Sequence, residues 1–216
     1  MLINRVLRHA VALSLSWCCL GVGIGFMASG IAVAAGDAEQ GQELAEDICA
    51  ACHGANGNSV NPQWPKLAGQ HAAYLAKQLY DFQSGEQRDN AIMYVQAEDL
   101  DDDDIANVAA YFAAQQIALG SADPQLIERG ESLYRGGDPE RGIAACSACH
   151  GPRGLGNEAA NFPRLSGQHQ EYLSIQLNAF RSGERANDSG QMMRNVAAKL
   201  NDDDIAALAS YLQGLR

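Results

Sequence analysis

Two copies of one five-residue pattern decide the interpretation of this chain: Cys49-Ala50-Ala51-Cys52-His53 and Cys146-Ser147-Ala148-Cys149-His150. Cys-x-x-Cys-His is the usual attachment sequence for c-type haem. Two thiols three positions apart can each form a thioether with one of the two vinyl groups of the porphyrin, and the adjacent histidine then faces the iron from the same side. The pattern therefore predicts two covalently bound haem c groups, each held by two cysteines and one histidine.

Cysteine pairs of this spacing also occur in zinc sites and in redox-active disulfides. A structural zinc site needs two pairs that converge on one ion, whereas here each pair lies in its own copy of the pattern. A thioredoxin-like pair needs no histidine after it and lies between a strand and a helix, a context that this sequence lacks. Both alternatives are weaker than covalent haem.

The surroundings of the two motifs are duplicated as well. Residues 64–71 (Trp-Pro-Lys-Leu-Ala-Gly-Gln-His) return as residues 162–169 (Phe-Pro-Arg-Leu-Ser-Gly-Gln-His), and each copy is followed by apolar residues at helical spacing. Gly85 and Gly183 are expected to end these helices. Each copy is predicted to form helix, haem-binding loop, helix, loop and helix, without strands. The expected fold is all-α, with two tandem domains at residues 36–122 and 123–216.

Residues 1–35 have the layout of a secretory signal peptide. Arg5 and Arg8 precede the uncharged run from Ala10 to Ala35, which ends in small residues. This run is also long enough to span a bilayer, so retention as a membrane anchor is the alternative. Cleavage leaves 181 residues with four cysteines and a formal net charge of −13. We expect export to the periplasm, as a soluble or membrane-associated protein.

The sixth iron ligand must come from elsewhere in each repeat. Without the leader the chain has only three methionines, Met93, Met192 and Met193, and alignment of the repeats pairs Met93 with Met193. We predict these two as ligands on a loop that crosses to the far face of each haem; Met192 is the alternative in the second repeat. Core packing by these methionines is the less specific interpretation.

Two further histidines also repeat, and they allow a bis-histidine alternative. His71 and His169 follow Gly-Gln at the start of a helix, and we interpret them as helix-start or surface residues. Pro65 and Pro163 follow the ligand histidines by 12 and 13 residues. A carbonyl oxygen at such a position is suited to accept the free N–H of the ligand histidine and to orient it; rigidity of the loop is the alternative role for these prolines.

Together the motifs, the Pro-x-Leu-x-Gly-Gln elements and the trailing methionines resemble the dihaem cytochrome c4 family over about residues 37–215. The resemblance implies two cytochrome c domains related by a pseudo-twofold axis, with His/Met ligation carried by His53 with Met93 and by His150 with Met193. It also implies a periplasmic electron carrier, often associated with terminal oxidases. The second copy departs from the first by extra residues around 135–141, for which we expect a loop.

These observations predict an electron-transfer protein and not an enzyme. The acidic charge disfavours nucleic acid as a partner and favours redox proteins with basic docking surfaces, such as a terminal oxidase or a complex of the quinol–cytochrome c reductase type. Peripheral association with the membrane stays open. The main alternative is an enzyme: a dihaem peroxidase, which two methionine-capped irons disfavour, or the haem subunit of a dehydrogenase. A further alternative is a membrane-anchored subunit of an oxidase or dehydrogenase complex, if the leader is retained.

Overall fold

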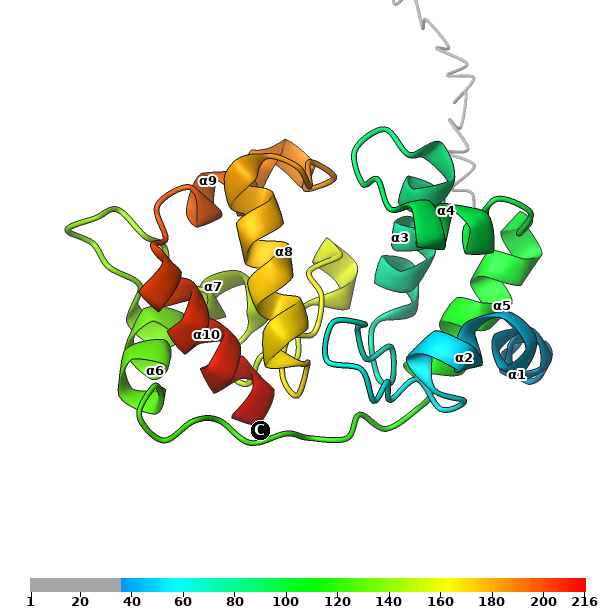
Figure 1. Ribbon diagram of the computed structural model, residues 1–216, viewed down its shortest axis with the longest axis horizontal. Coiled ribbons are helices and arrows are strands. Elements are labelled where there is room, and N and C mark those ends of the chain that lie inside the picture. Colours follow the sequence, from blue (N-terminus) through cyan, green and yellow to red (C-terminus); the bar gives the residue numbers. More distant parts are fainter. Residues whose placement is uncertain (1–35) are drawn as a thin grey trace, which may run out of the picture. The chain divides into compact units, whose positions relative to one another are not determined.

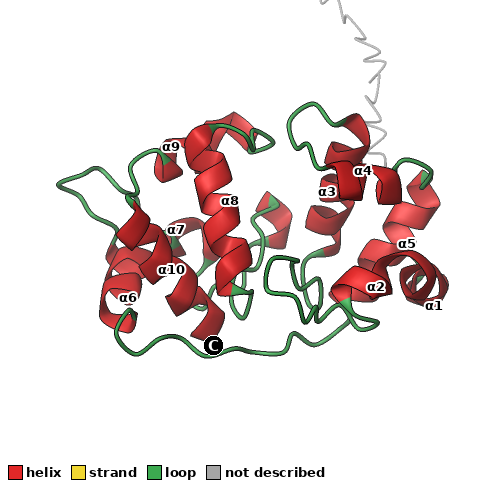
Figure 2. Cartoon of the chain, viewed as in Figure 1, coloured by secondary structure: helices red, strands yellow, loops and turns green. Residues whose placement is uncertain are grey.

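The computed structural model describes residues 36–216, so the predicted signal peptide lies outside the described residues. Helices and loops make up the described chain, with isolated bridges in place of any extended strand (Figures 1 and 2). No helix in this part of the chain is long and apolar enough to cross a membrane. The all-α prediction is confirmed.

The first half, residues 36–122, contains five α-helices and one π-helical turn. Their bounds in chain order are α1 (Ala38–Leu44), the π-helix Ala45–Cys49, α2 (Ala50–His53), α3 (Ala72–Ser84), α4 (Ala91–Ala97) and α5 (Asp102–Ala113). Helix α5 packs against α1 and α3 (Figure 1). As predicted, Gly85 ends α3 in the left-handed conformation. Asp101 and Asp104 form a capping box at the start of α5.

The second half, residues 123–216, repeats this arrangement. Its helices are α6 (Ile127–Gly136), α7 (Ser147–His150), a 3₁₀ turn Glu158–Ala160, α8 (Gln170–Ser182), a 3₁₀ turn Ser189–Gln191, α9 (Met192–Ala197) and α10 (Asp202–Gly214). Helix α10 packs against α6 and α8, as α5 does against α1 and α3. The predicted helix stop at Gly183 is present, and Asn201 caps the start of α10.

One glycine in each half permits the first and last helices to cross closely. A Cβ atom on Gly41 of α1 would lie 2.0 Å from the carbonyl oxygen of Asn107 in α5. A Cβ atom on Gly130 of α6 would lie 2.3 Å from the carbonyl oxygen of Ala207 in α10. Any side chain at either position would therefore force the helices apart.

The two halves have apolar cores of different size. The buried cluster of the second half contains eleven residues, among them Tyr134, Ile205 and Leu208. That of the first half contains six, among them Phe112 and Val108. The first cysteine of each motif packs against the cluster of its own half. A porphyrin bound at these cysteines would extend both clusters. The first half would depend on it more for stability, because its own cluster is smaller.

The extra residues of the second half form a turn that is tied to α10. Arg141 in this turn bonds Asp204 through Nη1 at 2.7 Å, and Arg129 of α6 bonds the same carboxylate at 2.5 Å. The Asp204 side chain is fully buried. Burial raises the pKa of Asp204, but hydrogen bonds from Arg141, from the backbone of the cap and from Arg129 outweigh it and hold the pKa below its usual value. The turn therefore has a structural role.

We expect Asp204→Asn to lower the free energy of unfolding by about 2 kcal/mol, because three charge-assisted hydrogen bonds from two arginines weaken in a buried place. The matched variant Asp104→Asn in the first half, where neither arginine has a counterpart bonded to the carboxylate, should change it by no more than about 0.5 kcal/mol. Because the folded pKa of Asp204 is lowered, its stabilisation is complete above the ordinary pKa and disappears as the pH falls through the lowered one. Urea unfolding at several pH values measures this; equal losses in both variants would contradict it.

Candidate haem sites

Each Cys-x-x-Cys-His motif lies on a helix and not in a loop, which corrects the sequence-based expectation. The first motif runs from the end of the π-helix through α2, and the second occupies α7 and the residue before it. On a helix, residues three apart lie on the same face, so both thiols of a motif can reach one porphyrin edge. Gly54 and Gly151 follow the histidines with φ of 77° and turn the chain away directly after each motif.

The two motif histidines are buried and oriented in the same way. His53 is 7% exposed and His150 is 6% exposed. The Nδ1 atom of His53 lies 2.9 Å from the carbonyl oxygen of Pro65, and that of His150 lies 2.9 Å from the carbonyl oxygen of Pro163. Because a carbonyl only accepts, the ring proton must lie on Nδ1. The lone pair at Nε2 then remains for a metal, and the predicted hydrogen bond to each proline carbonyl is confirmed.

Burial also keeps these imidazoles neutral. It lowers the pKa of His53 and of His150 below the ordinary value, and the hydrogen bond to the proline carbonyl offsets this only in part. A neutral imidazole with its proton fixed on Nδ1 is the form that coordinates a metal through Nε2.

The four cysteines of the described chain are free of disulfides. Burial raises the pKa of the Cys49 thiol to about 11, with the neighbouring Cys52 as a smaller cause, and burial likewise raises that of Cys146 to about 11. Such thiols are protonated at neutral pH, unlike the low-pKa thiol of a reactive redox pair. Within residues 36–216, no cluster of three or more Cys, His, Asp or Glu side chains is arranged to hold a metal ion. The two cysteine pairs are therefore not brought together around one site in residues 36–216, and the high thiol pKa values disfavour a reactive redox pair.

Met93 and Met193 occupy matching places on short helices, where the sequence had suggested a loop. Met93 lies in α4 and Met193 in α9, and each precedes by four residues an alanine that is fully buried, Ala97 and Ala197. Both methionines are half-buried, whereas Met192 is 43% exposed. The side chain of Asn90 caps α4 by accepting from the Met93 N–H at 3.0 Å, which fixes the backbone at this methionine.

His71 and His169 precede α3 and α8 as N-cap residues, at the predicted helix starts, and both are half-buried. The Nε2 atom of His71 donates to the carbonyl oxygen of Leu155 at 2.9 Å, and that of His169 donates to the carbonyl oxygen of Ser59 at 2.9 Å. Each ring thus contacts the opposite half through the nitrogen that a bis-histidine haem would use most readily. This arrangement disfavours the bis-histidine alternative.

Sequence reasoning missed a network that joins the two halves. Arg88 donates through Nη2 to the hydroxyl of Tyr172 at 2.9 Å, and Arg185 donates through Nη2 to the hydroxyl of Tyr74 at 2.9 Å. Each guanidinium also lies over a phenylalanine ring of its own half. The pairs are reciprocal, as the predicted pseudo-twofold relation requires. The available signal was weak: an arginine soon after the helix-ending glycine in both copies.

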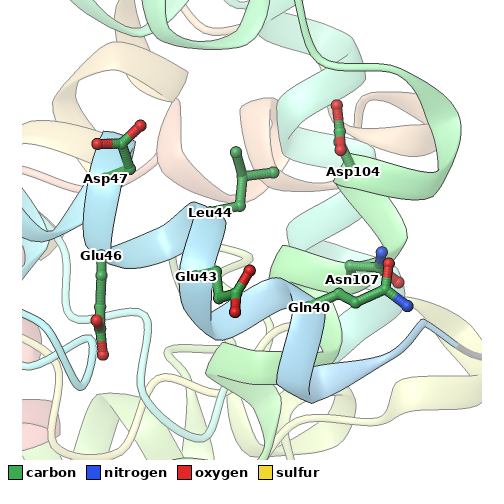
Figure 3. Close-up of a pocket in the computed structure, with 7 residues that line it drawn as sticks. All are labelled: Gln40, Glu43, Leu44, Glu46, Asp47, Asp104 and Asn107. Atoms are coloured by element: carbon green, nitrogen blue, oxygen red, sulfur yellow. The ribbon is translucent and has the colours of Figure 1, made fainter.

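A shallow hollow with acidic walls lies between α1, the π-helix and α5 (Figure 3). Carboxylates and amides line it almost entirely, and Leu44 is the exception: Gln40, Glu43, Leu44, Glu46, Asp47, Asp104 and Asn107. It includes none of the cysteines, histidines or methionines described above. The whole first half is acidic, with a formal net charge of −11 at residues 36–122 against −2 at residues 123–216.

The helical fold and its two Cys-x-x-Cys-His sites define a c-type cytochrome with one haem in each half. The family model described as cytochrome c matches this chain twice, over residues 38–115 and 127–216. A cytochrome c4 from Thiocapsa roseopersicina is 51% identical over 181 residues, which cover 83% of this chain and 93% of the relative. The chain belongs to the cytochrome c4 family.

Two further comparisons extend this result. The crystal structure of reduced recombinant cytochrome c4 from Pseudomonas stutzeri matches with a TM-score of 0.82 and 48% identity, covering 84% of this chain and 100% of that chain. A thiosulfate dehydrogenase electron acceptor from Stutzerimonas stutzeri strain A1501 is 41% identical over 179 residues, covering 79% of this chain and 80% of the relative. The chain is thus a dihaem c-type electron carrier with two covalently bound haem c groups.

Proposed function

We propose that this protein carries electrons in the periplasm between respiratory complexes, through two haems with His/Met ligation. In this proposal residues 1–35 are removed on export, and residues 36–122 and 123–216 are the two haem domains. His53 and Met93 hold one iron, and His150 and Met193 hold the other. The observation that carries the proposal is the pair of buried, neutral histidines, each oriented by a proline carbonyl for coordination through Nε2.

The matching positions of the methionines support the ligand assignment. Met93 and Met193 share the same offset to a buried alanine, and Met192 corresponds to Ile92, which is 61% exposed. Haem iron supplies a one-electron couple, and methionine sulfur raises its potential relative to a second histidine. The chain contributes fixed ligands and a pocket of low polarity, so that little rearrangement accompanies electron transfer.

The charge of the first half supports a docking role for its acidic face. An acidic face attracts a partner with a basic docking surface and accelerates encounter at low salt. We propose that partners of this kind, such as a terminal oxidase, approach the hollow between α1 and α5. The similarity to a thiosulfate dehydrogenase electron acceptor favours a second candidate, in which a dehydrogenase of that kind is the electron donor.

Neutralisation of Glu43, Glu46 and Asp47 should lower the second-order rate of electron transfer to a basic redox protein at least several-fold at low ionic strength, because steering is lost. The difference should vanish at high salt. Stopped-flow kinetics over a salt series measures this. Neutralisation of the exposed Glu140, Glu158 and Glu184 in the second half is the matched control and should change the rate less. An equal loss in both variants would show that overall charge, and not the first half, sets the rate.

A further inference from the structure

One peptide group in the first half connects the histidine of that half to the second half. The carbonyl oxygen of Pro65 accepts from Nδ1 of His53 at 2.9 Å. The N–H of the same peptide group belongs to Lys66, and it donates to Oε1 of Gln168 at 2.9 Å. The partner on one side of this peptide is therefore the haem histidine, and the partner on the other side comes from the opposite half of the chain.

The second half contains the reciprocal arrangement. The carbonyl oxygen of Pro163 accepts from Nδ1 of His150 at 2.9 Å, and the N–H of the same peptide, on Arg164, donates to Oε1 of Gln70 at 2.9 Å. The same contact thus occurs twice, once behind the proline carbonyl that faces each motif histidine.

The orientation of each glutamine amide is determined by its partners. Gln168 also donates through Nε2 to the carbonyl oxygen of Lys66 at 2.8 Å, and Gln70 donates through Nε2 to that of Arg164 at 2.9 Å. A flipped amide would lose both bonds at once. Its NH₂ group would then face the backbone N–H, and its oxygen would face the backbone carbonyl oxygen. Gln70 is 8% exposed and Gln168 is 5% exposed, so water competes little for these groups.

We propose that Gln168 lowers the reduction potential of the haem in the first half, and that Gln70 lowers the potential of the haem in the second half. A peptide N–H that donates to an acceptor polarises its own carbonyl, because linked hydrogen bonds strengthen one another in a low-dielectric place. The carbonyl then accepts more strongly from the histidine Nδ1–H and makes the ring a better electron donor to iron. A stronger donor stabilises the ferric state and lowers the potential.

In this inference the glutamines are positioning residues that act through a peptide and a histidine of the other half. The inference rests on the proposed coordination of iron by His53 and His150. It gives the Gly-Gln-His element of the repeat a role in tuning as well as in joining the halves.

The test uses the complete dihaem protein with Gln168→Met, a replacement of similar length without a hydrogen-bonding amide. A redox titration followed by NMR assigns each wave to a half through nuclear Overhauser contacts of each haem with residues of that half. We expect the potential of the first-half haem to rise while that of the second-half haem stays unchanged. The matched variant Gln70→Met should raise the potential of the second-half haem alone.

The Nδ1–H resonance of the haem histidine supplies a second measurement. In Gln168→Met the His53 resonance should move upfield, because its acceptor is weaker, whereas the His150 resonance stays in place. Gln168→Glu keeps an acceptor opposite the Lys66 N–H and should retain the downfield position. If one methionine variant does not fold, its reciprocal variant still tests the inference.

Glu171→Ala is the control for loosening of the contact between the halves. It removes the bond that Gln63 donates to Glu171 at 2.6 Å, which involves neither peptide, and it should move neither potential. Three results for Gln168→Met or Gln70→Met would overturn the inference. They are a change in the reduction potential of the haem in the substituted half, equal changes in both potentials, and no change in either. Haem content is measured first: fewer than two haems would contradict the proposed function, whereas two haems with a shift on the wrong one contradicts only this inference.

Discussion

Replacement of Met93 by alanine is expected to abolish the methionine–iron charge-transfer band of one haem and to leave that of the other. The potential of the affected haem should fall, because methionine sulfur favours ferrous iron. Carbon monoxide should then bind rapidly at that iron alone, since under the proposed ligation neither iron of the unaltered protein has an open position. Absorption near the charge-transfer band, redox titration and carbon monoxide binding measure the three effects.

The second half provides the matched comparison. Met193→Ala should reproduce all three effects at the other haem, and Met192→Ala should leave the band intact, because Met192 occupies the more exposed of the two adjacent positions. Loss of the band in Met192→Ala with retention in Met193→Ala would assign the ligand to Met192. Retention of both bands in Met93→Ala would contradict methionine ligation in the first half.

Simultaneous replacement of Cys49 and Cys52 by alanine is expected to give a protein with one covalent haem and half the haem absorbance per chain. The first half should also lose its cooperative thermal transition, because its buried cluster contains only six residues and Cys49 packs against it. Haem quantification under denaturing conditions and calorimetry measure the two effects.

The corresponding replacement of Cys146 and Cys149 should remove the other haem with a smaller loss of stability. The eleven-residue cluster of the second half depends less on the porphyrin for apolar contact. A larger loss of stability from the second-half variant than from the first would contradict this view of the two cores.

Much of the fold followed from local patterns. Helix stops at Gly85 and Gly183 and the N-caps at Asp101 and Asn201 were predictable because glycine conformation and side-chain capping involve residues a few positions apart. The short helices α4 and α9 are not predictable in this way, since seven or fewer residues contain too little periodicity to identify a helix.

The sequence alone determined that this chain binds two haems covalently, because thioether attachment depends on residues within one helical turn and the duplication repeats that turn. It also indicated a carbonyl for each ligand histidine, at Pro65 and Pro163. Only the tertiary structure decided which side chain accepts the hydrogen bond from the N–H of each of these two peptide groups. Gln168 reaches a peptide 102 residues away and Gln70 one that is 94 residues away, and contacts over such separations arise from the packing of one half against the other. The spacing of residues along the chain therefore does not predict these contacts.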